Sequence, residues 1–277
     1  MSGLTDGQMA DYFDRGFLVV ESLFDPARLD GLIGELNSVV DDWANRYHAM
    51  GRLGDMYSGE PFERRLNCIR EAMEDPSEVT EEVLGKRKTP AMFEVLTLPE
   101  ILDTVESVIG PEILVHPQFN SRAKFPDNRS VVDWHQDIGF LDEEVEDTFM
   151  VNFWVPLVDS DEKNGCLEVI PGSHKVGRIP FSKSPEDLLP DAMPQGEPVS
   201  CPVPKGGVLL LQHKTVHRST ENRSDGIRWS LDIRYSDPRL PTGRPNVPGF
   251  LARSRENPAA VCPNLEGWLQ SFEGIEA

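Results

Sequence analysis

The sequence predicts a mainly β protein with flanking helices, in which an antiparallel barrel or double-sheet jelly roll lies behind an N-terminal helical layer. Helical spacing of apolar residues dominates the first third of the chain. From about residue 113 onward, short apolar runs alternate with clusters of Gly, Pro, Asn and Asp, which is typical of strands and turns. No repeat or linker divides the chain, so we expect one domain over residues 1–277, with a helical layer over about 1–112, a jelly-roll core over about 113–236 and a tail over about 237–277.

The chain is expected to open with a short helix and a strand. Thr5 is followed three residues later by Gln8, which is the spacing of a capping box, and the helix should run to about Arg15. Gly16 ends this helix, and the apolar run 17–20 predicts a strand.

A longer helix is expected next. Asp25 and Pro26 supply an N-cap and a first-turn proline. The apolar residues that follow are spaced by three and four, so they form one stripe that should pack against a sheet. They are Leu29, Leu32, Ile33, Leu36, Val39, Val40 and Trp43. Residues 51–90 are weakly patterned and predict loops and short helices, and a further helix should run from Pro99 to about Ile109.

The second half of the chain reads as strands and turns. Trp268 and Phe272 are expected to anchor a tail that is otherwise rich in Pro and Gly. Strands are expected at 113–115, 148–155, 167–170, 208–212 and 227–235.

Composition excludes several classes of partner. The net charge of −20 and the isoelectric point near 4.6 make nucleic acid and anionic membranes poor partners. Four scattered cysteines with no C-x-x-C pair, and an N-terminus without a signal-peptide pattern, favour a cytoplasmic protein with reduced thiols. We expect a monomer or homodimer that acts on a small-molecule substrate and contacts no membrane.

The segment 134–137, which reads WHQD, carries the strongest chemical signal. His135 and Asp137 are two residues apart, so on an extended backbone both side chains project from the same face. Two imidazoles and one carboxylate suit Fe(II) and leave open coordination positions for a co-substrate and O2. His-x-Asp alone is a weak signal, because it also occurs by chance.

The third ligand and a carboxylate-binding arginine are expected further along the chain. His213 and His217 are both available, and we choose His217 for its distance to Arg228. In the run 227–235, Arg228 alternates with apolar residues and falls on the polar face of the predicted strand. That face either meets solvent or lines a barrel interior, where a guanidinium can bind a carboxylate through two hydrogen bonds.

Several segments resemble the phytanoyl-CoA dioxygenase family, and they occur along the chain in the family's order. The segment 164–175 reads NGCLEVIPGSHK and looks like the family's Asn-Gly-Cys-Leu and Pro-Gly-Ser-His segment. The segment 97–102, the His-Gln-Asp box, the spacing from His217 to Arg228 and the opening residues 4–20 also match. The resemblance covers about residues 4–235.

The resemblance implies a double-stranded β-helix, that is, a jelly-roll or cupin-like core, and an Fe(II)- and 2-oxoglutarate-dependent oxygenase that uses O2. It implies that His135, Asp137 and His217 bind iron and that Arg228 holds the distal carboxylate of 2-oxoglutarate. By the same similarity, Asn120, Trp154 and Ser219 contact the co-substrate, although Asn120 is not the residue that the family usually has there. Related halogenases replace the ligand carboxylate by a small residue, so Asp137 argues against halogenation.

The expected reaction is hydroxylation of a small metabolite with release of succinate and CO2. An acyl-CoA substrate would need a basic rim, for which Lys86-Arg87-Lys88, Arg122 and Lys124 are candidates, but the net charge of −20 favours a free small molecule. Two other functions stay open. One is a cupin-type metal enzyme that does not use 2-oxoglutarate and has no need for Arg228, and the other is a non-catalytic sensor of 2-oxoglutarate or iron.

Overall fold

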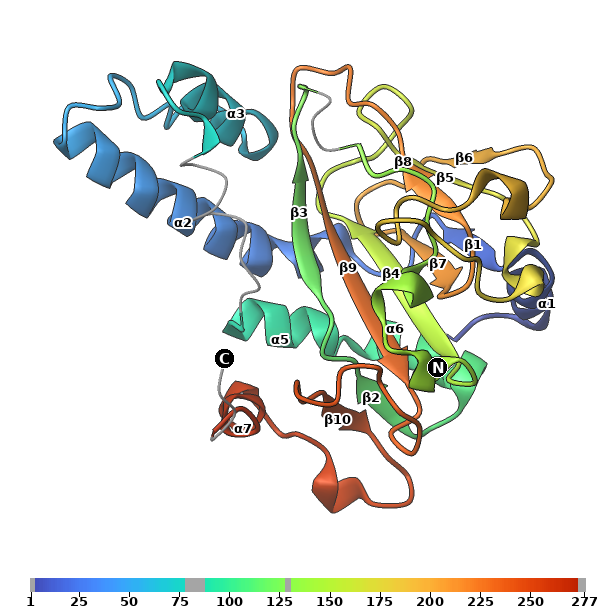
Figure 1. The fold of residues 1–277 in the computed structure, drawn as a ribbon. Helices are drawn as coiled ribbons and strands as arrows, with labels where there is room; N and C mark the ends of the chain where they lie inside the picture. Colours follow the sequence, from blue (N-terminus) through green and yellow to red (C-terminus); the bar gives the residue numbers. More distant parts are fainter. Residues whose placement is uncertain (1–2, 78–87, 128–130, 274–277) are drawn as a thin grey trace.

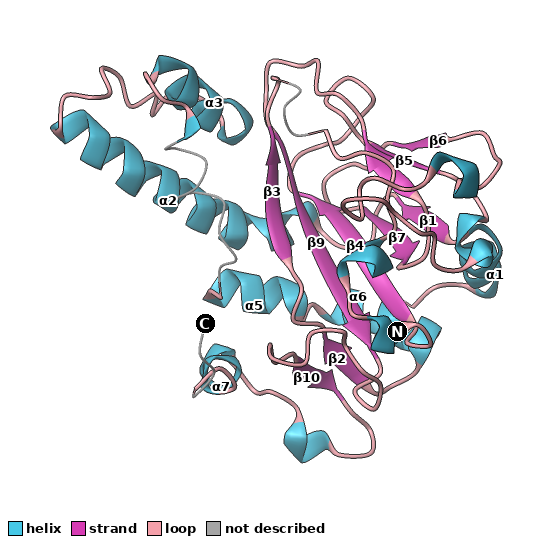
Figure 2. Ribbon diagram, viewed as in Figure 1, coloured by secondary structure: helices cyan, strands magenta, loops and turns pink. Residues whose placement is uncertain are grey.

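The structure is a computed structural model, and it describes residues 3–77, 88–127 and 131–273. Its core consists of two antiparallel sheets, as predicted (Figures 1 and 2). The larger sheet has the order β1 (Phe17–Val20), β7 (Val208–Gln212), β4 (Met150–Pro156), β9 (Arg228–Ser236), β2 (Ile113–Val115) and β10 (Phe250–Arg253), and β3 (Asn120–Lys124) also pairs with β9. The smaller sheet has the order β6 (Val199–Cys201), β5 (Leu167–Val169) and β8 (His217–Ser219). This is the double-sheet, jelly-roll arrangement that the sequence predicts.

The first elements form where the sequence places them. Helix α1 (Asp6–Arg15) opens with a reciprocal capping box, in which the Gln8 amide donates to Thr5 Oγ1 at 3.3 Å and the Thr5 amide donates to Gln8 Oε1 at 3.0 Å. Gly16 ends the helix with φ of 81°, a left-handed conformation that favours glycine. Strand β1 follows directly.

The long helix begins later than predicted. Asp25 and Pro26 start a 3₁₀ turn (Pro26–Leu29), and the α-helix α2 runs over Asp30–Ala49. The reason is local. The Asp25 carboxylate accepts a hydrogen bond from the Ala27 amide, and the backbone carbonyl of Asp25 accepts one from the Arg28 amide at 2.9 Å. These bonds close a 3₁₀ turn before the α-helix begins.

The helical layer shares one apolar core with the larger sheet. Most of the predicted stripe is buried, with Ile33 and Val39 half-buried, and α2 packs beside α3 (Phe62–Ala72) and α5 (Pro90–Leu96). The predicted helix at Pro99 is α6 (Pro99–Ile109). The tail adds β10 and α7 (Leu265–Gln270), which the sequence did not predict, and Trp268 anchors it by packing 5.1 Å from Phe250 between ring centroids. In the part of the chain that the structure describes, there is no helix long and apolar enough for a membrane span.

Strand β9 has an apolar face, which packs against the helical layer, and a polar face, which points to the space between the sheets. Trp229, Leu231, Ile233 and Tyr235 are fully buried in the core shared with the helices, and Phe62 of α3 stacks on Trp229 at 5.0 Å. The alternating polar residues, including Arg228 and Arg234, therefore line the space between the two sheets.

Candidate active site

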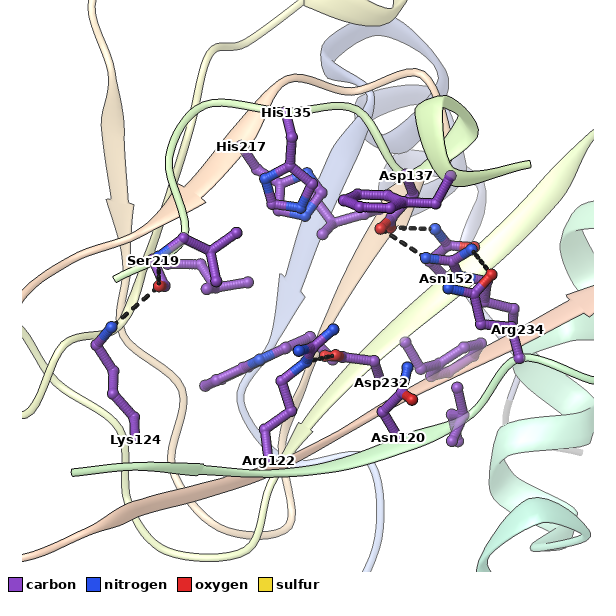
Figure 3. A pocket seen from close by; sticks show the side chains of 18 of the residues that line it. Asn120, Arg122, Lys124, His135, Asp137, Asn152, His217, Ser219, Asp232 and Arg234 are labelled. Atoms are coloured by element: carbon purple, nitrogen blue, oxygen red, sulfur yellow. Dashed lines mark hydrogen bonds and ion pairs between the residues drawn. The ribbon is translucent and has the colours of Figure 1, made fainter. Parts of the chain in front are cut away.

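A cavity of about 580 Å³ lies between the sheets. Its walls come from β3, β4, β7 and β9 of the larger sheet, from β5 and β8 of the smaller one, and from the segment 131–140. Figure 3 shows most of its charged and polar side chains pointing toward a common space. The residues that the sequence singles out all line this cavity, namely His135, Asp137, His217, Arg228, Asn120, Trp154 and Ser219.

A two-residue antiparallel bridge brings the two histidines together. The His135 amide donates to the His217 carbonyl and the His217 amide donates to the His135 carbonyl, each at 3.0 Å. Directly opposed residues of such a pair point to the same side. The imidazole centroids are accordingly 4.2 Å apart.

Asp137 joins them because the backbone at Gln136 is extended, with φ of −115° and ψ of 137°. The Gln136 side chain points the other way, where its amide donates to the carbonyls of Gly177 and Lys214 and its oxygen accepts from the Ile179 amide. Gln136 thereby fixes the loop. One ligand atom from each of His135, Asp137 and His217 lies within 4.8 Å of the others.

The protonation of both imidazoles fits a metal site. Nδ1 of His135 lies 2.8 Å from the Asp133 carbonyl, and Nδ1 of His217 lies 3.0 Å from the Thr215 carbonyl. A carbonyl only accepts, so each Nδ1 carries a proton, and Nε2 is the ring nitrogen left to face a metal. Burial, followed by the neighbouring His217, lowers the pKa of His135 to about 4, so this ring is neutral at pH 7. The donor set, two imidazole nitrogens and a carboxylate oxygen, fits Fe(II).

The Asp137 carboxylate is ionised although it is buried. Burial would raise its pKa, but Arg234, the two histidines and the Asn152 amide together hold the pKa of Asp137 well below its usual range. Arg234 Nη2 donates to Oδ1 at 2.6 Å, and Asn152 Nδ2 donates to Oδ2. The carboxylate is therefore held from both oxygens (Figure 3).

Arg228 provides a buried cation in the same cavity. Its guanidinium lies over the Trp154 ring, 4.8 Å from the centroid, and Nη1 donates to Ser230 Oγ at 2.9 Å. Nε is buried and has no hydrogen-bond partner among the described residues, which is costly for a charged group unless a ligand supplies an acceptor. Burial lowers the pKa of Arg228 to about 10, so it remains charged at pH 7.

Lys124 lies beside this cation. Lys124 Nζ donates to Ser219 Oγ at 3.0 Å, and the Ser219 hydroxyl oxygen also accepts from the Val132 amide at 2.9 Å. Burial, followed by the Arg228 charge, lowers the pKa of Lys124 to about 7. One region of the cavity thus presents two basic groups and a hydroxyl.

The remaining wall is polar. Asn120 and Asp232 are register partners on β3 and β9, and Arg122 forms an ion pair with Asp232. Phe140 contributes an apolar edge, with its ring 5.7 Å from His135 in a T-shaped contact. Trp134, next to His135 in the sequence, packs under the guanidinium of Arg218 at 4.5 Å.

Sequence reasoning missed Asn152 and Arg234, which bond Asp137, and it considered Lys124 only for the rim. The period-two pattern of 227–235 already placed Arg234 on the same face as Arg228, so that signal was present. His213, the alternative third ligand, lies outside the cluster, and its Nδ1 accepts from the Met150 amide at 3.4 Å.

The remaining histidines contact backbone carbonyls: His48 that of Leu53, His116 that of Thr242 and His174 that of Phe13. These contacts tie loops and elements together.

Comparison with known proteins identifies the family. A family model described as phytanoyl-CoA dioxygenase (PhyH) matches residues 12–230. Phytanoyl-CoA dioxygenase domain-containing protein 1 of Danio rerio is 28% identical over 271 residues, which cover 82% of this chain and 88% of that protein. A probable alpha-ketoglutarate-dependent hypophosphite dioxygenase of Stutzerimonas stutzeri is 24% identical over 249 residues, covering 83% and 77%.

Solved structures share the fold. The non-haem monooxygenase ThoJ in a nickel complex superposes with a TM-score of 0.63 at 18% identity, covering 97% of this chain and 95% of that one. The epimerase SnoN, in complex with Fe3+, alpha-ketoglutarate and nogalamycin RO, superposes with a TM-score of 0.57 at 18% identity, covering 86% of each chain. The chain therefore belongs to the phytanoyl-CoA dioxygenase family, and its His-Asp-His cluster fits a non-haem iron- and 2-oxoglutarate-dependent dioxygenase.

Proposed function

We propose that this enzyme hydroxylates a free small molecule, with His135, Asp137 and His217 holding Fe(II) and Arg228 holding 2-oxoglutarate. The observation that carries the proposal is the convergence of the three ligand atoms within 4.8 Å, in the same cavity as a buried arginine. The fixed Nδ1–H bonds of the two histidines support it, because they leave both Nε2 atoms to the metal.

The co-substrate fits the charge distribution of the cavity. A dicarboxylate needs one end at the metal and the other at a cation. Arg228 is buried, its Nε has no partner in the part of the chain that the structure describes, and Trp154 stacks beneath its guanidinium. Ser219 and Lys124 add donors in the same region. We assign Arg228, Ser219 and Trp154 to the distal carboxylate, and Asn120, on β3 beside the strand of Arg228, to a further contact.

Iron, 2-oxoglutarate and O2 supply the oxidising chemistry when bound, and the products are succinate, CO2 and the hydroxylated substrate. The side chains of this protein orient the reactants and exclude water. Arg228 and Trp154 hold one end of the keto acid, while Phe140, Leu167 and Leu211 supply apolar lining to the cavity. Asp137 keeps its carboxylate at the position where a halogenase would admit a halide.

The cavity favours a free small molecule over an acyl-CoA. Its volume of about 580 Å³ is within the range typical of small-ligand sites. The basic rim considered for CoA is not assembled among its described members: Lys124 is buried in the cavity, Arg122 is paired with Asp232, and Lys88 lies over the ring of Phe272. Lys86 and Arg87 lie outside the described residues.

We place the enzyme in a reducing, cytoplasmic setting. All four cysteines, Cys68, Cys166, Cys201 and Cys262, are free thiols, and burial raises the pKa of Cys166 to about 11. A thiol with a raised pKa stays protonated and unreactive at pH 7.

Succinate release tests the proposed function. Purified protein with Fe(II), 2-oxoglutarate and O2 should form succinate slowly alone and faster with a small polar metabolite from a screened panel. An acyl-CoA of the same panel should give no such stimulation. No succinate with any substrate, in protein shown to bind Fe(II) and 2-oxoglutarate, would contradict turnover and favour a sensor.

The KM for 2-oxoglutarate should depend on pH through Lys124. Below pH 7 the amine is charged and attracts the dianion, and above pH 7 it becomes neutral. We expect the KM to rise by about three- to tenfold between pH 6.5 and 8.5, equivalent to about 1 kcal/mol. Lys124→Met should have a high KM at both pH values, while Lys124→Arg, which stays charged, should keep a low one. If the KM of Lys124→Met rises between pH 6.5 and 8.5 by the same factor as that of the wild type, Lys124 is not the cause of the pH dependence.

A further inference from the structure

The Asp137 carboxylate sits in a preformed anion site made by two neighbouring strands of the larger sheet. Asn152 on β4 and Arg234 on β9 are register partners, so their side chains emerge side by side on the cavity face. Arg234 Nη2 donates to Oδ1 of Asp137 at 2.6 Å, and Asn152 Nδ2 donates to Oδ2 (Figure 3). An ionised carboxylate has about four lone-pair positions, so each oxygen still has one to offer after these bonds.

The two donors are themselves fixed. Arg234 Nη1 donates to Gln118 Oε1 at 2.8 Å, and the Arg234 carbonyl accepts from the His116 amide at 2.9 Å. The side chain of Arg234 is 5% exposed, and Asn152 is 4% exposed. Both residues belong to paired, central strands, so neither side chain can easily follow a displaced carboxylate.

We infer that Arg234 and Asn152 are positioning residues: they hold Asp137 for the metal and form a binding site for a small monovalent anion wherever that carboxylate is missing. The inference rests on the proposed metal role of Asp137. It extends that role, because the orientation of the Asp137 carboxylate is set from β4 and β9 as well as by the loop that Gln136 fixes. Removing either donor frees the carboxylate to rotate, and groups that orient metal ligands typically contribute 10- to 100-fold to metal affinity or activity, roughly.

The site left by the Asp137 side chain would bind a small carboxylate. Without the Asp137 side chain, a buried guanidinium and a buried amide would face an opening of carboxylate size with no acceptor. An unpaired buried charge is strongly unfavourable. Formate matches the lost group, since it carries the same carboxylate and lacks only the link to the backbone.

Asp137→Gly with added sodium formate is the decisive experiment, with Mn(II) as the metal because Mn(II) accepts the same ligands as Fe(II) and is visible by electron paramagnetic resonance. The free Mn(II) signal gives the affinity without any turnover. We expect Asp137→Gly to lose Mn(II) binding. Added formate should then raise the Mn(II) affinity of this variant by at least about tenfold. Formate should restore little in Asp137→Gly/Arg234→Met and in Asp137→Gly/Asn152→Leu. The Asn152 variant removes a donor without changing the charge near the metal.

Controls separate the possible failures. The single variants Arg234→Met and Asn152→Leu should weaken Mn(II) binding by about 10- to 100-fold, with partial recovery in Arg234→Lys. Arg239→Met, which removes an exposed arginine paired with Asp237, should behave as the wild type. Thermal unfolding establishes that each variant is folded. Unchanged Mn(II) binding in Asp137→Gly would contradict the proposed function itself. Loss of binding with no formate rescue, or with equal rescue in the double variants, would overturn the positioning inference alone.

Discussion

Replacing Asp137 or His217 by Ala is expected to abolish metal-dependent turnover. Each change removes one of three ligands from a cluster whose atoms lie within 4.8 Å of one another, and no other acidic or histidine side chain joins this cluster among the described residues. We expect succinate formation to fall by about 1000-fold, equivalent to about 4 kcal/mol of lost transition-state stabilisation. Succinate release and Mn(II) affinity, measured side by side, check this result.

His213 provides the matched control, because the sequence leaves it open as the third ligand. The backbone carbonyl of His213 accepts a hydrogen bond from the Ile138 amide at 2.9 Å and so supports the loop that carries Asp137. His213→Asn keeps this backbone contact. His213→Asn should therefore bind Mn(II) and release succinate near the wild-type level. The opposite pattern, in which the His213 variant loses the metal and His217→Ala retains it, would refute the ligand assignment.

Replacing Arg228 by Met is expected to raise the KM for 2-oxoglutarate by about 100-fold, equivalent to about 3 kcal/mol. The guanidinium is buried and lies over Trp154, and no described residue bonds its Nε. A methionine in its place offers the distal carboxylate neither charge nor hydrogen bonds. Steady-state kinetics with varied 2-oxoglutarate measure the change.

The same variant separates co-substrate binding from metal binding. Arg228 lies apart from the three ligands in the hydrogen-bond network, so Mn(II) affinity in Arg228→Met should equal that of the wild type. Arg228→Lys should recover only part of the affinity, because lysine lacks the planar pair of donors. An unchanged KM in Arg228→Met would favour a cupin-type enzyme that has no use for this arginine.

The sequence predicted the strands that carry an apolar run or a clear alternation of apolar and polar residues. β7 and β9 carry clear apolar runs or alternation, and both form as predicted. β3 was missed because its residues, NSRAK, are mostly polar, and the structure shows that Asn120, Arg122 and Lys124 line the cavity. β10 was missed because a short strand in a Pro- and Gly-rich tail depends on its pairing with β2.

The candidate site was predicted where spacing along the chain determines it. His135 and Asp137 share a face because one extended residue separates them. The His135–His217 bridge and the contacts of Asn152 and Arg234 with Asp137 depend on which strands pair and in what register. Register across distant strands is a tertiary property, so no local pattern carries it.

The most direct test of the central claim is the visible absorption spectrum of the purified protein with Fe(II) and 2-oxoglutarate in the absence of oxygen. Keto acid chelated to Fe(II) gives a weak charge-transfer band that neither component gives alone. We predict this band in the wild type, its loss in His135→Ala and Asp137→Ala, and its appearance only at higher 2-oxoglutarate concentration in Arg228→Met. A folded, iron-loaded wild-type protein that shows no band at saturating 2-oxoglutarate would contradict the assignment of the co-substrate to this cavity.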